Sequence, residues 1–196
     1  MIILVEGDGD KRALPVLVRR ELGISVTRCV DMRGKSNIIR KPKGFEDTVR
    51  RQHALGGRFF IILTDADVTF EPYKSLDEER RDMCQRAEAL ERELQVPVRA
   101  CRAVIAMESW LIGGIGRNDG YCGLKRRKQV ANNTEISPTN PKQWLKDHLK
   151  ESDYGPVVQE CLARHIDLCQ AKVCNRSLCA FLETLAKGLQ QLVDKA

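Results

Sequence analysis

Two short acidic motifs carry the residue types that metal-dependent hydrolysis requires. VEGDGD places Glu6, Asp8 and Asp10 directly after an apolar run, and LTDADVT places Asp65 and Asp67 directly after another. Two aspartates separated by one residue can hold a hard divalent cation, and magnesium suits them because it binds one or two carboxylates together with water and phosphate. The alternative for LTDADVT is a solvated turn with side chain-to-backbone hydrogen bonds. Because two such motifs each end an apolar run, the sequence favours the metal site.

The apolar runs before these motifs have the pattern of buried β-strands, and two more strands are expected from composition and alternation. The four expected strands are residues 2–5, 24–32, 59–63 and 96–107. Helical spacing of apolar residues predicts helices between them, in the segments at residues 7–22, 45–55 and 75–94. Pro15 is expected to delay or bend the first helix. The basic segment at residues 33–44 is expected to be a loop.

Alternating strands and helices predict an α/β fold with a parallel sheet that helices cover on both faces. Ligands of such sheets bind beyond the carboxyl ends of the strands, where Glu6, Asp65 and Asp67 are expected to meet. This domain is expected to span residues 1–115, with a basic polar connector at residues 116–139. A helical extension is predicted at residues 140–196, because Asn140 is a suitable N-cap and a leucine stripe follows.

The composition is ordinary for a globular protein and sets few limits on function. Of 196 residues, 42% are hydrophobic and 31% are charged, and the net charge of +6 permits an anionic partner. No apolar run approaches the ~20 residues that cross a bilayer, and no signal peptide is recognised. The eight cysteines are therefore expected to be reduced thiols in a cytoplasmic protein. Without a C-x-x-C pair, zinc ligation by the four cysteines from Cys161 onward is not expected.

VEGDGD after the first strand and TDAD after the third together resemble the Toprim domain of topoisomerases, primases and overcoming-lysogenization-defect nucleases. The nuclease branch is similar in having a second acid four residues after its glutamate, where this sequence has Asp10 in place of the usual Glu. AMESWLIG, NPKQWL and RSLCAFLETL also resemble segments of a bacterial Toprim-like family of unknown function. The first resemblance covers about residues 1–112, and the second covers most of the chain.

The resemblance implies a Toprim or Rossmann-like sheet and a magnesium-dependent nuclease, with manganese as a substitute cation. It implies that Glu6, Asp65 and Asp67 are catalytic and that these three residues and Asp10 bind metal. Glu6 would then act as a general acid or base, or as a ligand of a second cation. The substrate would be DNA or RNA, and defence against phage is a role that the resemblance suggests. Many relatives work with a separate ATPase subunit, so such a partner is a further expectation.

Other residues have a supporting role under this hypothesis. Asp8, Lys11 and Glu108 lie in or near the acidic motifs. A solvent-facing lysine at a helix start explains Lys11 better than a phosphate contact does, whereas a helix N-terminal acid and a member of the acidic cluster explain Glu108 equally well. Two basic segments could bind a nucleic-acid backbone, although each also has the composition of a solvated loop. Their candidate residues are Arg33, Lys35, Arg40, Lys41, Lys43, Lys125, Arg126, Arg127 and Lys128.

Two alternative functions stay open from the residues alone. DADVT also fits the Asp-x-Asp-x-Thr motif of haloacid-dehalogenase-like phosphatases, in which Asp65 would be the nucleophile and Asp67 the acid or base. Such enzymes carry this motif on the first strand and add a later acidic pair, and neither feature is present here. The second alternative is a non-catalytic Toprim module that binds nucleic acid or a partner ATPase. The presence of Glu6, Asp65 and Asp67 argues against it.

Overall fold

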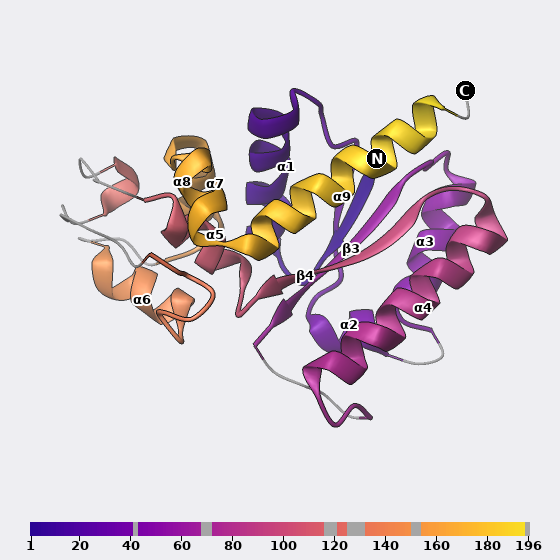
Figure 1. Cartoon of the computed structure of the whole chain (residues 1–196), viewed down its shortest axis with the longest axis horizontal. Helices are drawn as coiled ribbons and strands as arrows, with labels where there is room; N and C mark the ends of the chain where they lie inside the picture. Colours follow the sequence, from indigo (N-terminus) through magenta and orange to yellow (C-terminus); the bar gives the residue numbers. More distant parts are fainter. Residues whose placement is uncertain (41–42, 68–71, 116–120, 125–131, 150–153, 195–196) are drawn as a thin grey trace.

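The centre of the protein is a four-stranded parallel sheet with the order β2-β1-β3-β4. The computed structural model describes residues 1–196 except 41–42, 68–71, 116–120, 125–131, 150–153 and 195–196. The strands are β1 (Ile2–Val5), β2 (Arg28–Asp31), β3 (Phe60–Ala66) and β4 (Val98–Val104). Their carboxyl ends point toward the part of the molecule that contains α5 and α6 (Figure 1). The predicted α/β fold, with a helix-covered parallel sheet and C-terminal helices, is confirmed.

Helices cover the sheet on both faces. Because successive side chains of a strand point to opposite faces, the residues of one strand enter two different apolar clusters. Ile2 and Leu4 of β1 belong to one apolar cluster, whereas Ile3 and Val5 belong to the other. This explains why the strand has no polar position before Glu6. The first cluster is covered by α2 (Lys35–Ile39), α3 (Phe45–Ala54) and α4 (Leu76–Leu94).

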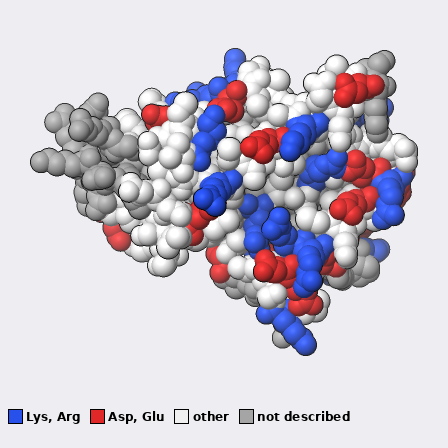
Figure 2. Space-filling view, in the orientation of Figure 1, with Lys and Arg blue, Asp and Glu red and all other residues white. Residues whose placement is uncertain are grey.

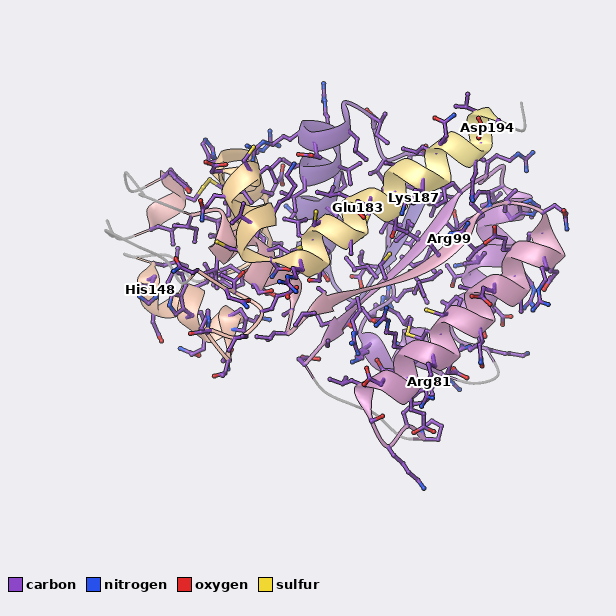
Figure 3. The ribbon with its side chains drawn as sticks, viewed as in Figure 1. Arg81, Arg99, His148, Glu183, Lys187 and Asp194 are labelled. Atoms are coloured by element: carbon purple, nitrogen blue, oxygen red, sulfur yellow. A yellow bond between two sulfur atoms is a disulfide. The ribbon has the colours of Figure 1, made fainter. Side chains whose placement is uncertain are left out.

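The opposite face is covered by helices from both ends of the chain. They are α1 (Asp8–Leu22), α5 (Met107–Gly113), α7 (Pro156–His165), α8 (Leu168–Cys174) and α9 (Arg176–Val193). In this layer α7 packs on α1, α8 packs on α5, and α9 contacts β4. Apolar residues of the helical extension therefore share one core with the sheet. The outer side of α9 is polar, and Figure 3 shows Glu183 and Lys187 on it.

Two local expectations about the first helices differ from the structure, namely a late start of the first helix and a loop at residues 33–44. Helix α1 begins at Asp8 and contains Pro15, so the proline does not delay it. The proline ring removes only one backbone donor, and the buried Leu14, Leu17 and Val18 hold the helix on the sheet. The segment expected to be a basic loop contains the short helix α2, in which Lys35, Ile38 and Ile39 are buried.

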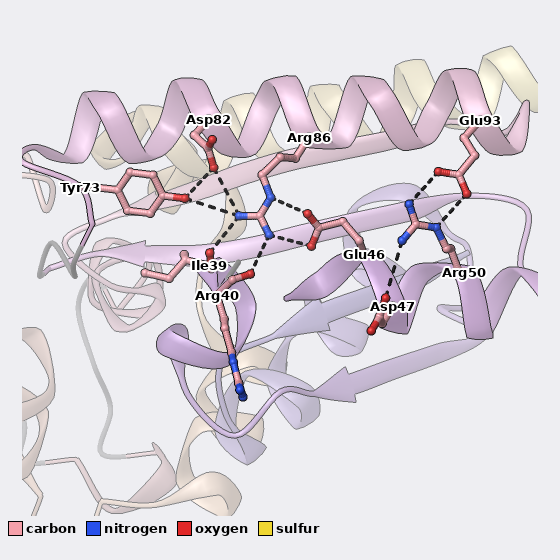
Figure 4. A network of polar contacts seen from close by, with 9 residues as sticks. All are labelled: Ile39, Arg40, Glu46, Asp47, Arg50, Tyr73, Asp82, Arg86 and Glu93. Atoms are coloured by element: carbon pink, nitrogen blue, oxygen red, sulfur yellow. Dashed lines mark hydrogen bonds and ion pairs between the residues drawn. The ribbon is translucent and has the colours of Figure 1, made fainter. Parts of the chain in front are cut away.

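A network around Arg86 fixes α2 and α3 beneath α4 (Figure 4). Its guanidinium group donates to both carboxylate oxygens of Glu46, at 2.6 Å each, and to the backbone oxygens of Ile39 and Arg40. Paired hydrogen bonds between a guanidinium and a carboxylate are strong and directional. The end of α2 is thereby anchored, and with it the position of Lys35 at the helix start.

The connection between the sheet and the extension contains η1 (Tyr121–Gly123), followed by α6 (Pro141–His148). Cys122 of η1 forms a disulfide with Cys161 of α7, and the other six cysteines are free. The expectation of eight reduced thiols is wrong for this pair, because the fold brings together two cysteines that are 39 residues apart. Among the described residues, no helix has both the length and the apolar character needed to cross a bilayer.

Candidate functional site

The acidic motifs meet at the point of the sheet where the chain reverses its direction of winding. The chain passes from β1 outward to β2 and then returns across β1 to β3. Ligands of open α/β sheets bind at such a switch point, beyond the carboxyl ends of the strands. Glu6 follows β1, Asp65 lies near the end of β3, and the Glu6 Oε1 atom accepts a 2.7 Å hydrogen bond from the Asp65 backbone N–H. The predicted meeting of the two motifs is therefore present in the structure.

Two more carboxylates reach the same place from helices. Asp10 lies in the first turn of α1, and Glu108 lies in the first turn of α5. Together with Glu6, Asp65 and Asp67 they line a cleft of about 480 Å³. The other lining residues are Gly9, Gly34, Ile105, Ala106, Thr139, Asn140, Pro141, Lys142 and Gln159. Larger hollows lie beside β4 (about 590 Å³) and at α1 (about 620 Å³), but they bring together fewer carboxylates.

Asp65 is the best anchored of these acids. Its Oδ1 atom accepts a 3.0 Å hydrogen bond from the backbone N–H of Met107, the first residue of α5. Its own N–H is bound to Glu6 and its backbone oxygen accepts a 2.7 Å hydrogen bond from Lys35. The residue thus joins β1, α2 and α5 at one point, which holds its side chain in a single orientation.

Burial and mutual repulsion make it costly for all these acids to be ionised. Burial raises the pKa of the Glu6 carboxyl to about 7. The pKa of Asp10 is also raised to about 7, first by burial and then by the charges of Glu108 and Glu6. Burial raises the pKa of Asp65 well above its ordinary value, and it also raises the pKa of Glu108. A buried carboxylate without a cation favours its neutral form, so this cleft favours protons or a metal ion.

The donor atoms of the cleft are of the kind that a hard divalent cation binds, but among the described residues no three of these carboxylates place oxygen atoms within 4.8 Å of one another. Among the described residues that line the cleft, five carboxylates face one cationic side chain, that of Lys142. All candidate ligand atoms are oxygens, which magnesium and manganese prefer, whereas the cleft lining contains no cysteine or histidine. Glu6, Asp10, Asp65 and Asp67, the four predicted ligands, all lie in this lining.

The sequence suggests Lys35 as a nucleic-acid-binding residue, but in the structure this residue does not lie on the surface. Its side chain is buried, with 3% exposure, and its Nζ atom lies 3.1 Å from Glu79 Oε1 and 4.0 Å from Asp67 Oδ1. Nζ also donates the hydrogen bond to the Asp65 backbone described above. The interpretation failed because α2 turns this residue inward, under the end of β3. Lys35 therefore holds the backbone of Asp65 in place and is inaccessible to a polymer.

Other predicted residues lie away from the cleft or outside the described part of the chain. Asp8 forms ion pairs with Lys11 and Arg12 on the surface of α1, and neither Asp8 nor Lys11 lines the cleft. The exposed residues Arg33, Arg40 and Lys43 do not line it either. Lys41, Lys125, Arg126, Arg127 and Lys128 lie outside the described residues. On the face shown in Figure 2, basic and acidic side chains are interspersed and form no uniformly basic surface.

The outer wall of the cleft comes from residues that the sequence did not assign to it. Asn140 caps α6 by accepting a 3.0 Å hydrogen bond from the Gln143 N–H, which sets the helix N-terminus and Lys142 at the cleft. From α7, the Gln159 Nε2 atom donates to Glu108 Oε1 over 3.3 Å. A Cβ atom on Gly9 would lie 1.5 Å from Gln159 Oε1, so this glycine allows α7 to approach. NPKQW predicted the helix start, but no sequence signal placed it here.

No protein-family model, no curated protein and no solved structure matches this chain. The resemblance to Toprim domains therefore stays an interpretation of the motifs.

Proposed function

We propose that the chain is a magnesium-dependent phosphodiester hydrolase that cuts DNA or RNA. The observation that carries this proposal is the convergence of five carboxylates from β1, α1, β3 and α5 in one cleft at the switch point of the sheet. Phosphodiesters are anionic, and a cluster of carboxylates would repel them unless cations were bound between the two. Magnesium bound here would supply Lewis acidity and an activated water molecule.

The contacts of each cleft side chain indicate whether it would bind a cation, transfer a proton or face the polymer. Asp65 is fixed through Oδ1 and both backbone groups, so its Oδ2 atom is the one left to bind a cation. Glu6 uses Oε1 to accept the Asp65 N–H, which leaves Oε2 to accept a proton from an attacking water or to contact a second cation. Asp67 is half-exposed at the open side of the cleft, where a polymer can approach.

The substrate phosphate would be positioned from the outer wall. Lys142 lies in the first turn of α6, where its ammonium group and the positive end of the helix dipole attract anions. Lys142 also favours the ionised forms of Asp10 and Glu108, since its charge lowers the pKa of both groups against the larger effect of burial. The cleft therefore places its positive groups opposite the strand ends, with the carboxylates between them.

The test is cleavage of supercoiled plasmid and of end-labelled RNA with Mg²⁺ or Mn²⁺. We expect wild-type protein to cut at least one polymer and Asp65→Asn to lose more than about 100-fold of that activity, since it weakens both cation binding and orientation. Asp8→Asn is the matched control, because it removes the same charge from the other acidic motif, at a residue that pairs with Arg12 on the surface of α1 and does not line the cleft. Equal activity of Asp65→Asn and Asp8→Asn would refute the assignment of the cleft.

Two other outcomes would select a different function. Turnover of a small phosphomonoester, without cleavage of either polymer, would favour the phosphatase alternative. No activity on any substrate, with Mg²⁺-dependent binding of nucleic acid, would favour a non-catalytic module or one that needs a partner ATPase. Thermal melts of each variant show whether lost activity reflects lost folding.

A further inference from the structure

A second cluster of metal-binding side chains lies at the junction between η1 and α7. Cys122, Cys161 and His165 place their ligand atoms within 4.8 Å of one another. The His165 Nδ1 atom lies 3.7 Å from the Cys122 sulfur and 3.8 Å from the Cys161 sulfur. These residues do not line the acidic cleft, and thiolate with imidazole is a different donor set from its carboxylates.

The two distances to nitrogen already suit a tetrahedral zinc-type centre. With Zn–S bonds of about 2.3 Å and Zn–N bonds of about 2.05 Å, tetrahedral angles give an S···N separation of about 3.5 Å and an S···S separation of about 3.8 Å. Only the two sulfur atoms, which are bonded to each other here, would have to move apart. Rotation of the two cysteine side chains can provide that movement, because their Cα atoms are 5.7 Å apart and sit on separate elements.

The imidazole of His165 is already held in place for such a role. Its ring stacks on Tyr121, with ring centroids 5.5 Å apart, and its Nδ1–H donates a 2.8 Å hydrogen bond to the backbone oxygen of Cys161, which ligation through Nδ1 would replace. His165 is exposed, and both cysteines are partly exposed, so a reductant and a cation can reach them. A fixed ring lowers the entropy cost of ligation.

We propose that Cys122, Cys161 and His165 bind a zinc-type divalent cation when the two cysteines are reduced. A phosphine reductant breaks the S–S bond: the phosphorus is oxidised to its oxide with oxygen from water, and the two sulfurs become thiols. Binding of the cation then releases both thiol protons, and the imidazole of His165 shifts its proton from Nδ1 to Nε2 through water, so that Nδ1 binds the cation with its lone pair. The three side chains leave a fourth position for water. The cation and the disulfide would thus hold η1 on α7 in alternative states.

The experiment uses the full chain, reduced with the phosphine and freed of it under nitrogen, and titrated with Co²⁺. We expect one equivalent to give thiolate-to-cobalt charge-transfer absorption and the intense visible bands of tetrahedral Co²⁺. One equivalent of Zn²⁺ should remove both signals, because zinc binds such sites more tightly than cobalt. The oxidised chain should give neither signal. Cobalt in the acidic cleft would have oxygen ligands and no charge-transfer band, and excess Mg²⁺ would compete with it.

Variants assign the ligands. Cys122→Ser and Cys161→Ser should lose the tetrahedral signal, whereas His165→Ala should keep charge-transfer absorption and bind at least 10-fold more weakly. Cys169→Ser removes an exposed free thiol of α8 and should bind as wild type does. In wild-type protein, Zn²⁺ should protect Cys122 and Cys161, but not Cys169, from alkylation, as mapped by mass spectrometry.

The proposal is overturned if the reduced wild-type chain shows no charge-transfer band with Co²⁺. It is also overturned if both cysteine variants bind as wild type does, or if Zn²⁺ leaves Cys122 and Cys161 fully open to alkylation. The alkylation measurement needs no variant, so misfolding of a substituted chain cannot obscure it.

Discussion

The buried ion pair between Lys35 and Glu79 lies next to Asp65, and its contribution to the stability of the fold can be measured. Both side chains are almost fully buried, at 3% and 1% exposure, and Nζ and Oε1 are 3.1 Å apart. We expect Lys35→Met to destabilise the protein strongly, because it leaves the Glu79 carboxylate in the interior without its cation. The Asp65 backbone oxygen would also lose its hydrogen-bond donor.

The size of the effect follows from the separation and the burial. Two unit charges 3.1 Å apart attract by about 5 kcal/mol at an effective dielectric constant of about 20. Removal of one partner from a buried pair costs about 3–5 kcal/mol in measured cases, so we expect Lys35→Met to lower the free energy of unfolding by that amount at pH 8.

The assay is urea unfolding followed by far-ultraviolet circular dichroism, with two comparisons. The double variant Lys35→Met with Glu79→Leu should recover most of the loss, since two apolar side chains need no charge compensation beside Met83 and Thr64. Arg50→Met breaks the Arg50–Glu93 pair, whose atoms are as close as 2.8 Å but whose side chains are about half exposed (Figure 4). It should cost less than about 1 kcal/mol.

Two results would refute this reasoning. If Lys35→Met cost no more than Arg50→Met, burial would not govern the strength of the pair. If the double variant were as unstable as Lys35→Met, the loss would come from packing or from the Asp65 hydrogen bond, and the unpaired carboxylate would not be its cause.

Two further predictions concern the acids and the packing. Because burial raises the pKa of Glu6 from 4.5 to about 7, the folded chain binds more protons than the unfolded chain between these values, and metal-free protein should lose stability as the pH rises through this window. We expect the loss in free energy of unfolding between pH 5 and pH 8, measured in EDTA, to be up to about 3 kcal/mol smaller in Glu6→Gln than in wild type. An equal loss in the two proteins would contradict the pKa shift. Gly188→Ala should destabilise by about 1–3 kcal/mol, although alanine favours helix, because its Cβ would lie 2.2 Å from the Phe59 ring. Gly155→Ala, with open space around its Cβ, should lower the free energy of unfolding by less than about 1 kcal/mol. Equal losses of the two alanine variants in chemical denaturation would contradict the steric argument.

The sequence predicted the convergence of the acidic motifs for a simple geometric reason. Apolar runs before Glu6 and Asp65 identified two buried strands, and parallel strands present their carboxyl ends at one edge of a sheet. No long-range information was needed beyond the alternation of strands and helices. Glu108 could be only a candidate, because a helix N-terminal acid looks the same in sequence whether it faces a cleft or solvent.

The residues that the sequence misplaced depend on contacts between distant segments. Lys35 follows Arg33 and Gly34 in a basic stretch, and two isoleucines are too few to show a helical period. Its burial depends on the ion pair with Glu79, and this residue follows only after α3 and β3. The pairing of Cys122 with Cys161 is hidden for the same reason, since spacing rules for cysteines apply to local motifs.

Helix α7 connects the acidic cleft with the cysteine–histidine cluster. Gln159 reaches Glu108 from one side of the helix, and Cys161 and His165 face η1 from another. Helix α7 also packs along α1, the helix that carries Asp10. The two proposed cation sites remain chemically separate, since one offers oxygen and the other sulfur and nitrogen. Both nevertheless depend on α7, which contributes Gln159 to the inner cleft and Cys161 and His165 to the outer cluster.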